Sequence, residues 1–263
     1  ELAEQVAALP YDVVTREEAE KIGEENPYSF LHVDRAEIDL DPEVDPYSTQ
    51  VYEKARETLQ KMEEDGVMRQ DPSPCYYIYQ QQMKDYVQTG LVGCASIDDY
   101  RNQVVKRHEL TRAEKEQDRI RHVDTCDANT GPIFLTGHFP MELIELRNQW
   151  IESHEAEYDF VAEDGIAHRV WVIDDEDIIR QVEKYVRQIP SFYIADGHHR
   201  AASAVKVGLK RRKEHPDYTG EEEFNYFLSV LFPCRHMQIL PYNRVVLDRN
   251  GFEEKGILNM VKL

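Results

Sequence analysis

Hydrophobic positions along the chain follow two periods, which predicts a protein that combines helices with strands. Apolar residues recur at helical spacing over residues 51–62 and 178–189, so both segments are expected to form helices that bury one face. Apolar runs of strand length lie at residues 76–79, 91–97, 133–135, 158–162, 168–173, 192–195, 224–232 and 237–247. Because helices and strands are interleaved, we predict a mixed α/β fold in which helices flank a mixed sheet.

Turn and capping residues indicate where several elements begin. Thr15 with Glu18, and Thr111 with Glu114, each have the spacing of a capping box, in which two side chains satisfy free N–H groups at a helix start. The other predicted elements are helices at 49–65, 98–105, 112–125, 140–151, 175–189 and from 198 on, a strand at 29–33, and hairpins that join 76–79 to 91–97 and 158–162 to 168–173. Pro241 lacks a backbone N–H, so the strand at 237–247 is expected at a sheet edge or a bulge.

The length of the chain bounds its organisation. A chain of 263 residues can form a large hydrophobic core, and we expect one compact domain over residues 1–263, with a subdivision into 1–97 and 98–263 as the alternative. Because the chain starts at Glu1 rather than Met, we also expect it to be a fragment of a longer protein. The sequence predicts no particular oligomeric state.

Charge and cysteine content exclude several classes of protein. With 31 Lys and Arg against 51 Asp and Glu, the net charge is −20, and the one basic run, 210–213, is short, so we expect no nucleic acid partner. The four cysteines are widely separated, which predicts neither a zinc site nor disulfides and favours a reducing, cytoplasmic location. No apolar run approaches the roughly 20 residues that span a bilayer, so no membrane partner is expected.

The segment 192–204, FYIADGHHRAASA, carries the strongest chemical pattern. A short apolar run breaks at a Gly and a helix with small residues follows, which predicts a strand, a tight turn and a helix start. Free N–H groups at a helix start favour an anion, and a glycine lets it approach the backbone closely. The candidate residues for holding phosphate are Asp196, Gly197, His198, His199 and Arg200. A solvated turn is the structural alternative, and a metal held by the two histidines is disfavoured because adjacent side chains diverge.

A second polar concentration precedes the predicted helix 112–125. Arg107, His108 and Glu109 lie just before its start, where an anion would again be favoured and a carboxylate is at hand. Along the helix, Asp118 and His122 share one face. Arg119 borders that face, so this polar helix either lies on the surface or turns its charges into a polar cleft.

Further polar residues lie beside predicted turns and strand ends, where α/β proteins often bind ligands. Tyr11, Asp12, Asn26, His32 and Asn129 are of this kind, and each also fits a structural role in its turn. Together with Arg119 and His122, we take Tyr11, Asp12, Asn26 and Asn129 as the candidate substrate-binding residues.

Five strings, in this order and spacing, resemble a known family. They are PYDVVT, NPYSFLHVDR, KRHELTRAEKEQDRIRH with TCDANTGPIF, ADGHHRAASA, and ILPYNRVV. They span nearly the whole chain and resemble the bacterial and archaeal family called domain of unknown function 1015. That resemblance implies no activity.

The strand, DGHHR turn and Ala-rich helix are also similar to the phosphate-binding motif of the ParB and sulfiredoxin superfamily. This resemblance implies a ParB/sulfiredoxin-like core with insertions, and it implies that residues 196–200 hold the phosphates of ATP or ADP. Free serine kinases of that superfamily have a similar DGH motif and use an acidic residue as base to phosphorylate L-serine. Glu17, Glu18 and Glu109 are the candidates for that base.

These observations favour phosphoryl transfer to a small hydroxyl-bearing metabolite, with serine as the first candidate. Arg200 and Arg107 would neutralise phosphate charge, with Mg²⁺ held by Asp196. Glu109 or Asp196 would accept the hydroxyl proton, and His108 would donate a hydrogen bond. The alternatives are a non-catalytic nucleotide or metabolite sensor and a phosphoserine phosphatase. A ParB-like DNA-binding protein would fit the motif but not the charge.

Overall fold

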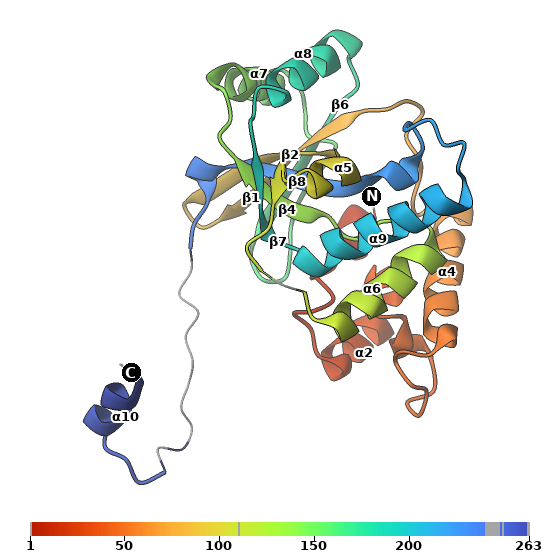
Figure 1. Cartoon of the computed structure of the whole chain (residues 1–263), viewed down its shortest axis with the longest axis vertical. Coiled ribbons are helices and arrows are strands. Elements are labelled where there is room, and N and C mark those ends of the chain that lie inside the picture. The colour runs from red at the N-terminus through yellow and green to blue at the C-terminus, as the bar shows by residue number, and fades with distance from the viewer. Residues whose placement is uncertain (1, 110, 240–247, 249, 262–263) are drawn as a thin grey trace.

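A mixed sheet of eight strands organises the part of the chain that is described (Figure 1). The computed structural model describes residues 2–109, 111–239, 248 and 250–261. The strands lie in the order β3-β7-β4-β8-β2-β1-β6-β5. Their bounds are β1 Tyr76–Met83, β2 Tyr86–Ser96, β3 Val105–Lys106, β4 Ile133–Gly137, β5 Tyr158–Val161, β6 Ala167–Ile173, β7 Phe192–Asp196 and β8 Tyr226–Pro233. The predicted mixed sheet is confirmed.

Both hairpins form as predicted, and they build the antiparallel half of the sheet. β1 pairs with β2 and β6, and β6 pairs with β5, all antiparallel. The other half is mixed, since β4 is parallel to β8 but antiparallel to β7. β7, the strand before the DGHHR turn, lies second from the edge of the sheet, between β4 and the two-residue β3.

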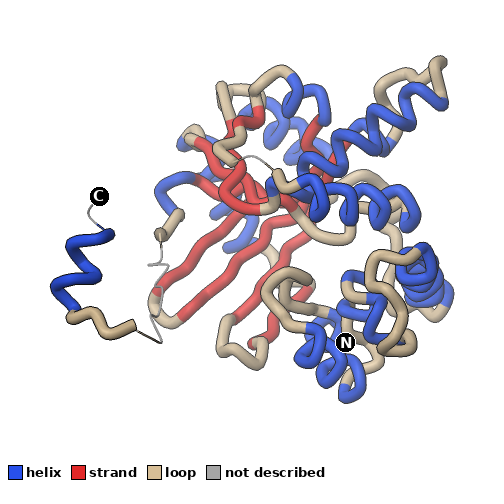
Figure 2. The backbone as a smooth tube through the Cα atoms, turned by 60° about the horizontal axis from the view of Figure 1, so that its bottom comes forward, coloured by secondary structure: helices blue, strands red, loops and turns tan. Residues whose placement is uncertain are grey.

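Helices cover one face of this sheet. Side chains of alternate strand residues, among them Ile78, Leu135, Ile194 and Leu231, form the main core with α5, α7, α8 and α9. Those helices span Ile97–Arg101, Met141–Ser153, Glu176–Val186 and His198–Glu214. On the opposite face the tyrosines and valines of β1, β2 and β6 are half-buried. In Figure 2 most of the length of the central strands is visible with no helix in front of it.

A second, smaller core joins the N-terminal helices to α6 (Ala113–Cys126). Val33, Val51, Ala55, Leu59 and Cys126 are among its buried residues. α6 lies between α9 and α4, so it connects the N-terminal helices to the sheet (Figure 1). The remaining helices are α1 Ala3–Val6, α2 Arg16–Glu25, α3 Leu31–Asp34, η1 Ala36–Asp39, α4 Thr49–Glu64, η2 Glu223–Asn225, η3 Cys234–His236 and α10 Glu254–Val261.

Several local predictions are confirmed and others are wrong. The capping box of Thr15 and Glu18 starts α2. The second box is wrong, because the Thr111 hydroxyl donates to Glu116 rather than capping α6. The strand at 29–33 is wrong, because this segment turns into the short helix α3. The predicted helix 98–105 ends as α5 at Arg101, where β3 soon follows.

Two remaining predictions concern the C-terminal segment and the membrane. Most of the strand predicted at 237–247, including Pro241, lies outside the described residues, and residues 237–239 are not in a strand. Among the helices that are described, none is both long and apolar enough to cross a bilayer.

Candidate functional site

The turn between β7 and α9 has the geometry of an anion-binding helix start. Gly197 is the N-cap of α9 and has a φ of 90°, a conformation that residues with a Cβ rarely adopt. Among the residues that the structure describes, no side chain caps the helix, and the first N–H groups of α9 have no partner within the helix itself. The buried residues Ala201 and Ala204 pack this helix closely on the core. The predicted strand, turn and helix are therefore present, with free N–H groups at the turn.

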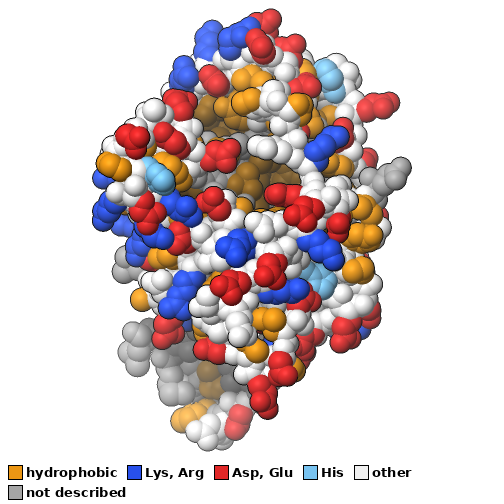
Figure 3. Space-filling view, turned by 90° about the vertical axis from the view of Figure 1, so that its right-hand side faces the viewer, with side chains coloured by type: hydrophobic (Ala, Val, Ile, Leu, Met, Phe, Trp, Pro, Cys, Tyr) orange, Lys and Arg blue, Asp and Glu red, His pale blue; other side chains and the backbone are white. Residues whose placement is uncertain are grey.

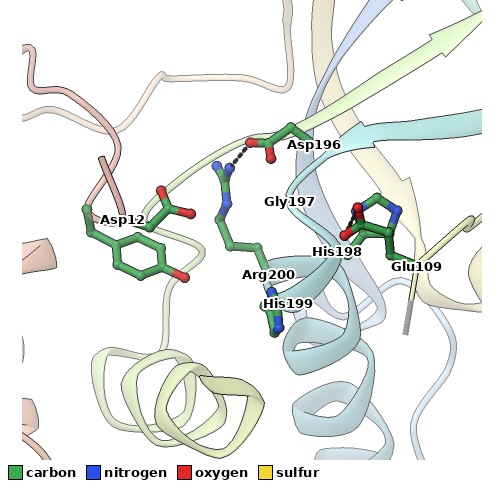
Figure 4. A pocket seen from close by; sticks show the side chains of 8 residues that line it. Asp12, Glu109, Asp196, Gly197, His198, His199 and Arg200 are labelled. Atoms are coloured by element: carbon green, nitrogen blue, oxygen red, sulfur yellow. Dashed lines mark hydrogen bonds and ion pairs between the residues drawn. The ribbon is translucent and has the colours of Figure 1, made fainter. Parts of the chain in front are cut away.

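A solvent-open hollow lies beside this turn (Figure 4). Its empty volume is about 300 Å³, which includes space open to the solvent. Three segments far apart in the sequence supply its lining, which consists of Tyr11, Asp12, Glu109, Asp196, Gly197, His198, His199 and Arg200. The structure thus brings Glu109 of the loop before α6 to the DGHHR turn, together with two of the candidate substrate-binding residues.

Arg200 is fixed across the first turn of α9. Its Nη2 donates to Oδ2 of Asp196 over 2.7 Å, and its Nη1 donates to the carbonyl of Pro132. A Cβ on Gly197 would lie 3.3 Å from the Arg200 guanidinium carbon, so the glycine lets this side chain lie against the turn. The result is a positive charge held in place beside free N–H groups, with one Asp196 oxygen already paired.

His198 and Glu109 form the opposite wall. The Nδ1 atom of His198 lies 3.9 Å from Oε2 of Glu109, and the ring of His108 meets the His198 ring edge-on at 4.5 Å between centroids. His198 is only 7% exposed, and its buried Nε2 has no hydrogen-bond partner among the described residues. Burial and the neighbouring His108 lower the pKa of His198, so its ring is mainly neutral at neutral pH.

His199 connects the hollow to α6. Its Nε2 accepts a hydrogen bond from the backbone N–H of Arg112 over 3.1 Å, so this nitrogen carries no proton in the observed arrangement. The contact holds the start of α6 against the start of α9. His199 therefore positions the loop that carries Glu109 as well as lining the hollow.

The N-terminal wall is backed by Arg119. Its guanidinium carbon lies 4.0 Å from the centre of the Tyr11 ring, and its Nε donates to Asp118 over 2.9 Å. Burial raises the pKa of Tyr11, although Arg119 opposes this shift. Arg119 thus holds a residue that lines the hollow without lining it itself.

The polar helix α6 turns its charges inward, so of the two alternatives the surface position is wrong. Glu116, Arg119 and His122 are all buried. The carboxylate of Glu116 pairs with Lys206 of α9, and Asp118 accepts a hydrogen bond of 2.8 Å from the Tyr52 hydroxyl of α4. Sequence periodicity could not show this, because both faces of α6 are packed by other helices.

Two candidates on or near α6 lie away from the hollow. Arg107 donates to the hydroxyl of Tyr100 over 3.2 Å and is not part of the lining. His122 is buried, and its Nε2 lies 3.0 Å from the carbonyl oxygen of Val33. Burial lowers the pKa of His122, which fits a neutral histidine that joins α6 to α3.

The remaining turn residues have structural surroundings. The side-chain amide of Asn26 donates to the Gln5 carbonyl over 2.7 Å. His32 Nδ1 lies 2.9 Å from a carboxylate oxygen of Asp39. Asn129 is half-buried in the turn after α6 and is not part of the lining. The structure does not bring these three residues to the hollow.

Of the three glutamates that are candidates for the base, Glu109 alone lines the hollow. Glu18 accepts the Thr15 N–H in its capping box, and Glu17 lies on the exposed first turn of α2. Among the described residues, no group of three or more His, Cys, Asp or Glu side chains is placed to hold a metal ion. Asp196 could therefore contribute one ligand to an ion whose other ligands came from elsewhere.

The contacts that sequence reasoning missed involve the backbone. The Pro132 carbonyl and the Arg112 N–H fix Arg200 and His199, yet neither residue carried a chemical pattern of its own. Such contacts follow from how β4 and α6 pack on α9, which no local spacing predicts.

Several basic side chains at the surface lie beside acidic ones. On the face drawn in Figure 3, Lys and Arg side chains are interspersed with Asp and Glu. Three of the four residues of the basic run on α9 are paired within the fold, since Lys210 and Arg211 both contact Asp124 and Arg212 contacts Asp98.

Comparisons with known proteins agree with the five strings. Searches of curated proteins and of solved structures give no significant match. A family model described as protein of unknown function (DUF1015) matches residues 1–263. The chain therefore belongs to the DUF1015 family over its whole length.

Proposed function

We propose that this chain binds the phosphates of ATP or ADP at the start of α9 and transfers a phosphoryl group to the hydroxyl of a small metabolite. Free serine is the first candidate acceptor. One observation carries the proposal: a single hollow joins an uncapped helix start, a fixed arginine and an exposed carboxylate. On this reading, β7, the turn and α9 are the ParB/sulfiredoxin-like core, and the N-terminal helices are among its insertions.

Phosphate binding would use the groups around Gly197. The free N–H groups of the first turn would donate to an anion placed at the helix start, and the helix dipole would favour the negative charge of that anion. Arg200 adds a fixed guanidinium beside them. Because Gly197 has no side chain, a phosphate oxygen can approach the turn closely.

Glu109 is the better candidate for the base. Its carboxylate is 63% exposed, and the nearest histidine nitrogens lie 3.9 and 4.0 Å away, beyond hydrogen-bond distance. Its lone pairs are thus open to a hydroxyl proton, whereas Asp196 is engaged by Arg200. Asp12 lies across Arg200 from Glu109 in Figure 4. An exposed carboxylate there would pair with the ammonium group of an amino acid acceptor.

Mg²⁺ fits this hollow only as a partner of the nucleotide. Mg²⁺ commonly uses one or two carboxylates together with phosphate oxygens and water, so Asp196 could supply a protein ligand. When bound, the ion would neutralise charge on the transferred group. Asp196 would then contact both Arg200 and the ion. The chain's own residues would align the phosphate with the acceptor.

A sensor is the second candidate. Because Asp196 is already paired with Arg200, a hollow in which Glu109 accepted no proton would bind phosphate without turnover. A phosphoserine phosphatase would use the same hollow. Product analysis separates the three. A kinase forms phosphoserine together with ADP if ATP is the donor or AMP if ADP is the donor, a phosphatase releases inorganic phosphate from phosphoserine, and a sensor forms no product.

The experiment is calorimetric titration with ADP and ATP, followed by phosphorus NMR with Mg²⁺, L-serine and either ATP or ADP as the donor. We expect saturable nucleotide binding in the wild type, loss of binding in Arg200→Gln, and phosphoserine formation that Glu109→Gln abolishes. Glu114→Gln, an exposed acid on the first turn of α6, is the matched control and should keep both properties. Absence of nucleotide binding would overturn the proposal, and binding without any product would leave the sensor.

A further inference from the structure

Cys234 and His138 form a side-chain pair at the end of the sheet remote from the hollow. β4 ends at Gly137 and β8 at Pro233, and these two residues are partners in a parallel pair of strands. The residues that follow the two strands, His138 after β4 and Cys234 after β8, therefore lie side by side. The Cys234 Sγ lies 3.1 Å from the His138 Nδ1.

The register places this pair well away from the hollow. On β4, Phe134 pairs with Asp196 at the hollow, whereas Gly137 pairs with Phe192. His138 is four residues beyond Phe134, which is about 13 Å along a strand. None of the residues assigned to the hollow contributes to this pair, so its chemistry is independent of the proposed function.

Two of the cysteines lie near a histidine, but in the part of the chain that the structure describes only Cys234 has a close contact that is open to solvent. The Cys126 Sγ lies 4.0 Å from Nε2 of His122, and both residues are buried. Burial raises the pKa of the Cys75 and Cys94 thiols, and it raises the pKa of Cys126 to about 12. These three thiols therefore keep their protons at neutral pH and are weak nucleophiles. Taken as a whole residue, however, Cys94 is exposed to solvent, whereas Cys234 is half-buried. Exposure alone would therefore predict that Cys94 reacts first.

We propose that Cys234 is a nucleophilic thiol, activated by His138, that forms mixed disulfides with small-molecule disulfides. As the sulfur attacks, the thiol proton passes to Nδ1 of His138. A new S–S bond forms between Cys234 and one half of the small disulfide, the original S–S bond breaks, and the other half leaves as a thiolate. His138 then returns the proton to this thiolate. The small disulfide is itself the two-electron oxidant, since one of its sulfurs leaves as a thiol while Cys234 becomes part of a disulfide, so no further oxidant is needed. The pair is a site for reversible covalent modification.

The test compares two cysteines in the same molecule. The folded wild type is treated with excess oxidised glutathione, and peptide mass spectrometry follows the modification of each of the four cysteines over time. We expect Cys234 to react at least about tenfold faster than the more exposed Cys94, because nucleophilic attack rather than access sets the rate. A Cys94 rate equal to or above that of Cys234 overturns the proposal.

A variant tests the role of the imidazole. His138→Gln keeps a polar side chain but cannot take up the proton, so we expect the Cys234 rate to fall about tenfold or more while the Cys94 rate stays unchanged. The Cys94 rate is the internal control for folding. An unchanged Cys234 rate would show that the pair is only a contact. If His138→Gln does not fold, the ratio of the Cys234 rate to the Cys94 rate in the wild type still tests the proposal.

Discussion

Replacing Gly197 by alanine separates the effect on phosphate binding from the effect on folding. The added Cβ has two consequences. It forces a residue with a side chain to hold a φ of 90°, which costs about 1–2 kcal/mol of stability. It also lies 3.3 Å from the Arg200 guanidinium carbon, a tight contact that pushes this side chain slightly away from the turn. We therefore expect both stability and nucleotide affinity to fall.

The expected losses can be estimated. A destabilisation of about 1–2 kcal/mol lowers the unfolding temperature of a chain of this size by roughly 2–8 °C. A charge-assisted hydrogen bond contributes about 1.5–3 kcal/mol, so loss of one such contact to phosphate weakens ADP binding by about 10- to 150-fold. Thermal unfolding measures the first effect and calorimetric titration with ADP the second.

Gly165→Ala is the matched control. Gly165 has a φ of 78° in the turn of the second hairpin, and a Cβ there would meet nothing within 4 Å. We expect a similar loss of stability with unchanged ADP affinity. If Gly197→Ala binds ADP as tightly as Gly165→Ala, the turn does not hold the phosphate and the reasoning is refuted.

Three further predictions concern the base, the buried charge and the packing of α9. Glu109→Gln should keep ADP affinity but lose about 10²- to 10⁴-fold in phosphoserine formation, and loss of affinity instead would assign Glu109 to binding. Burial alone would raise the pKa of Glu116, yet hydrogen bonds from Lys206 and Thr111 lower it overall. The charged Glu116 therefore stabilises the fold above the ordinary pKa of a glutamate, and this stabilisation is lost as the pH falls below that value. Glu116→Gln should accordingly show a smaller drop in unfolding free energy between pH 7 and 3 than the wild type. A drop equal to that of the wild type would contradict this. Gly208→Ala would place a Cβ 2.3 Å from a backbone oxygen, so urea unfolding should show a loss of about 1–3 kcal/mol or more, and a neutral effect would show that α9 can shift.

Local chemistry made a large part of the fold predictable. Gly197 could be identified as the turn because an apolar run stops before it and small residues follow, and both the strand and the helix formed there. The two hairpins and α4 followed in the same way from alternation, turn residues and a helical stripe. These features depend on neighbours in sequence, which is why their prediction succeeded.

Tertiary packing decided the rest. The segment 29–33 has strand-like residues, but Leu31 and Val33 are buried in the N-terminal cores as part of a helical turn. Thr111 bonds to Glu116, since Lys206 of α9 draws that carboxylate to the start of α6. Strand order and the burial of α6 depend on contacts between segments far apart, which the sequence pattern does not contain.

The candidate site shows the same division. Residues 196–200 and Glu109 were predicted from the chemistry of two helix starts, and the hollow unites them. Arg107 has a side chain that is equally suited to binding phosphate, but it is held by Tyr100 and does not line the hollow. Residue type alone could not show this. The stacking of Arg119 on Tyr11 joins two candidates in a contact that spacing could not reveal.

The most direct measurement of the central claim is a two-dimensional amide NMR titration of the wild-type chain with ADP. We predict that the largest chemical-shift changes fall on the backbone N–H groups of His198, His199 and Arg200, because these groups would bind the phosphate. Saturable changes confined to other parts of the chain, or no changes at all, would contradict the account.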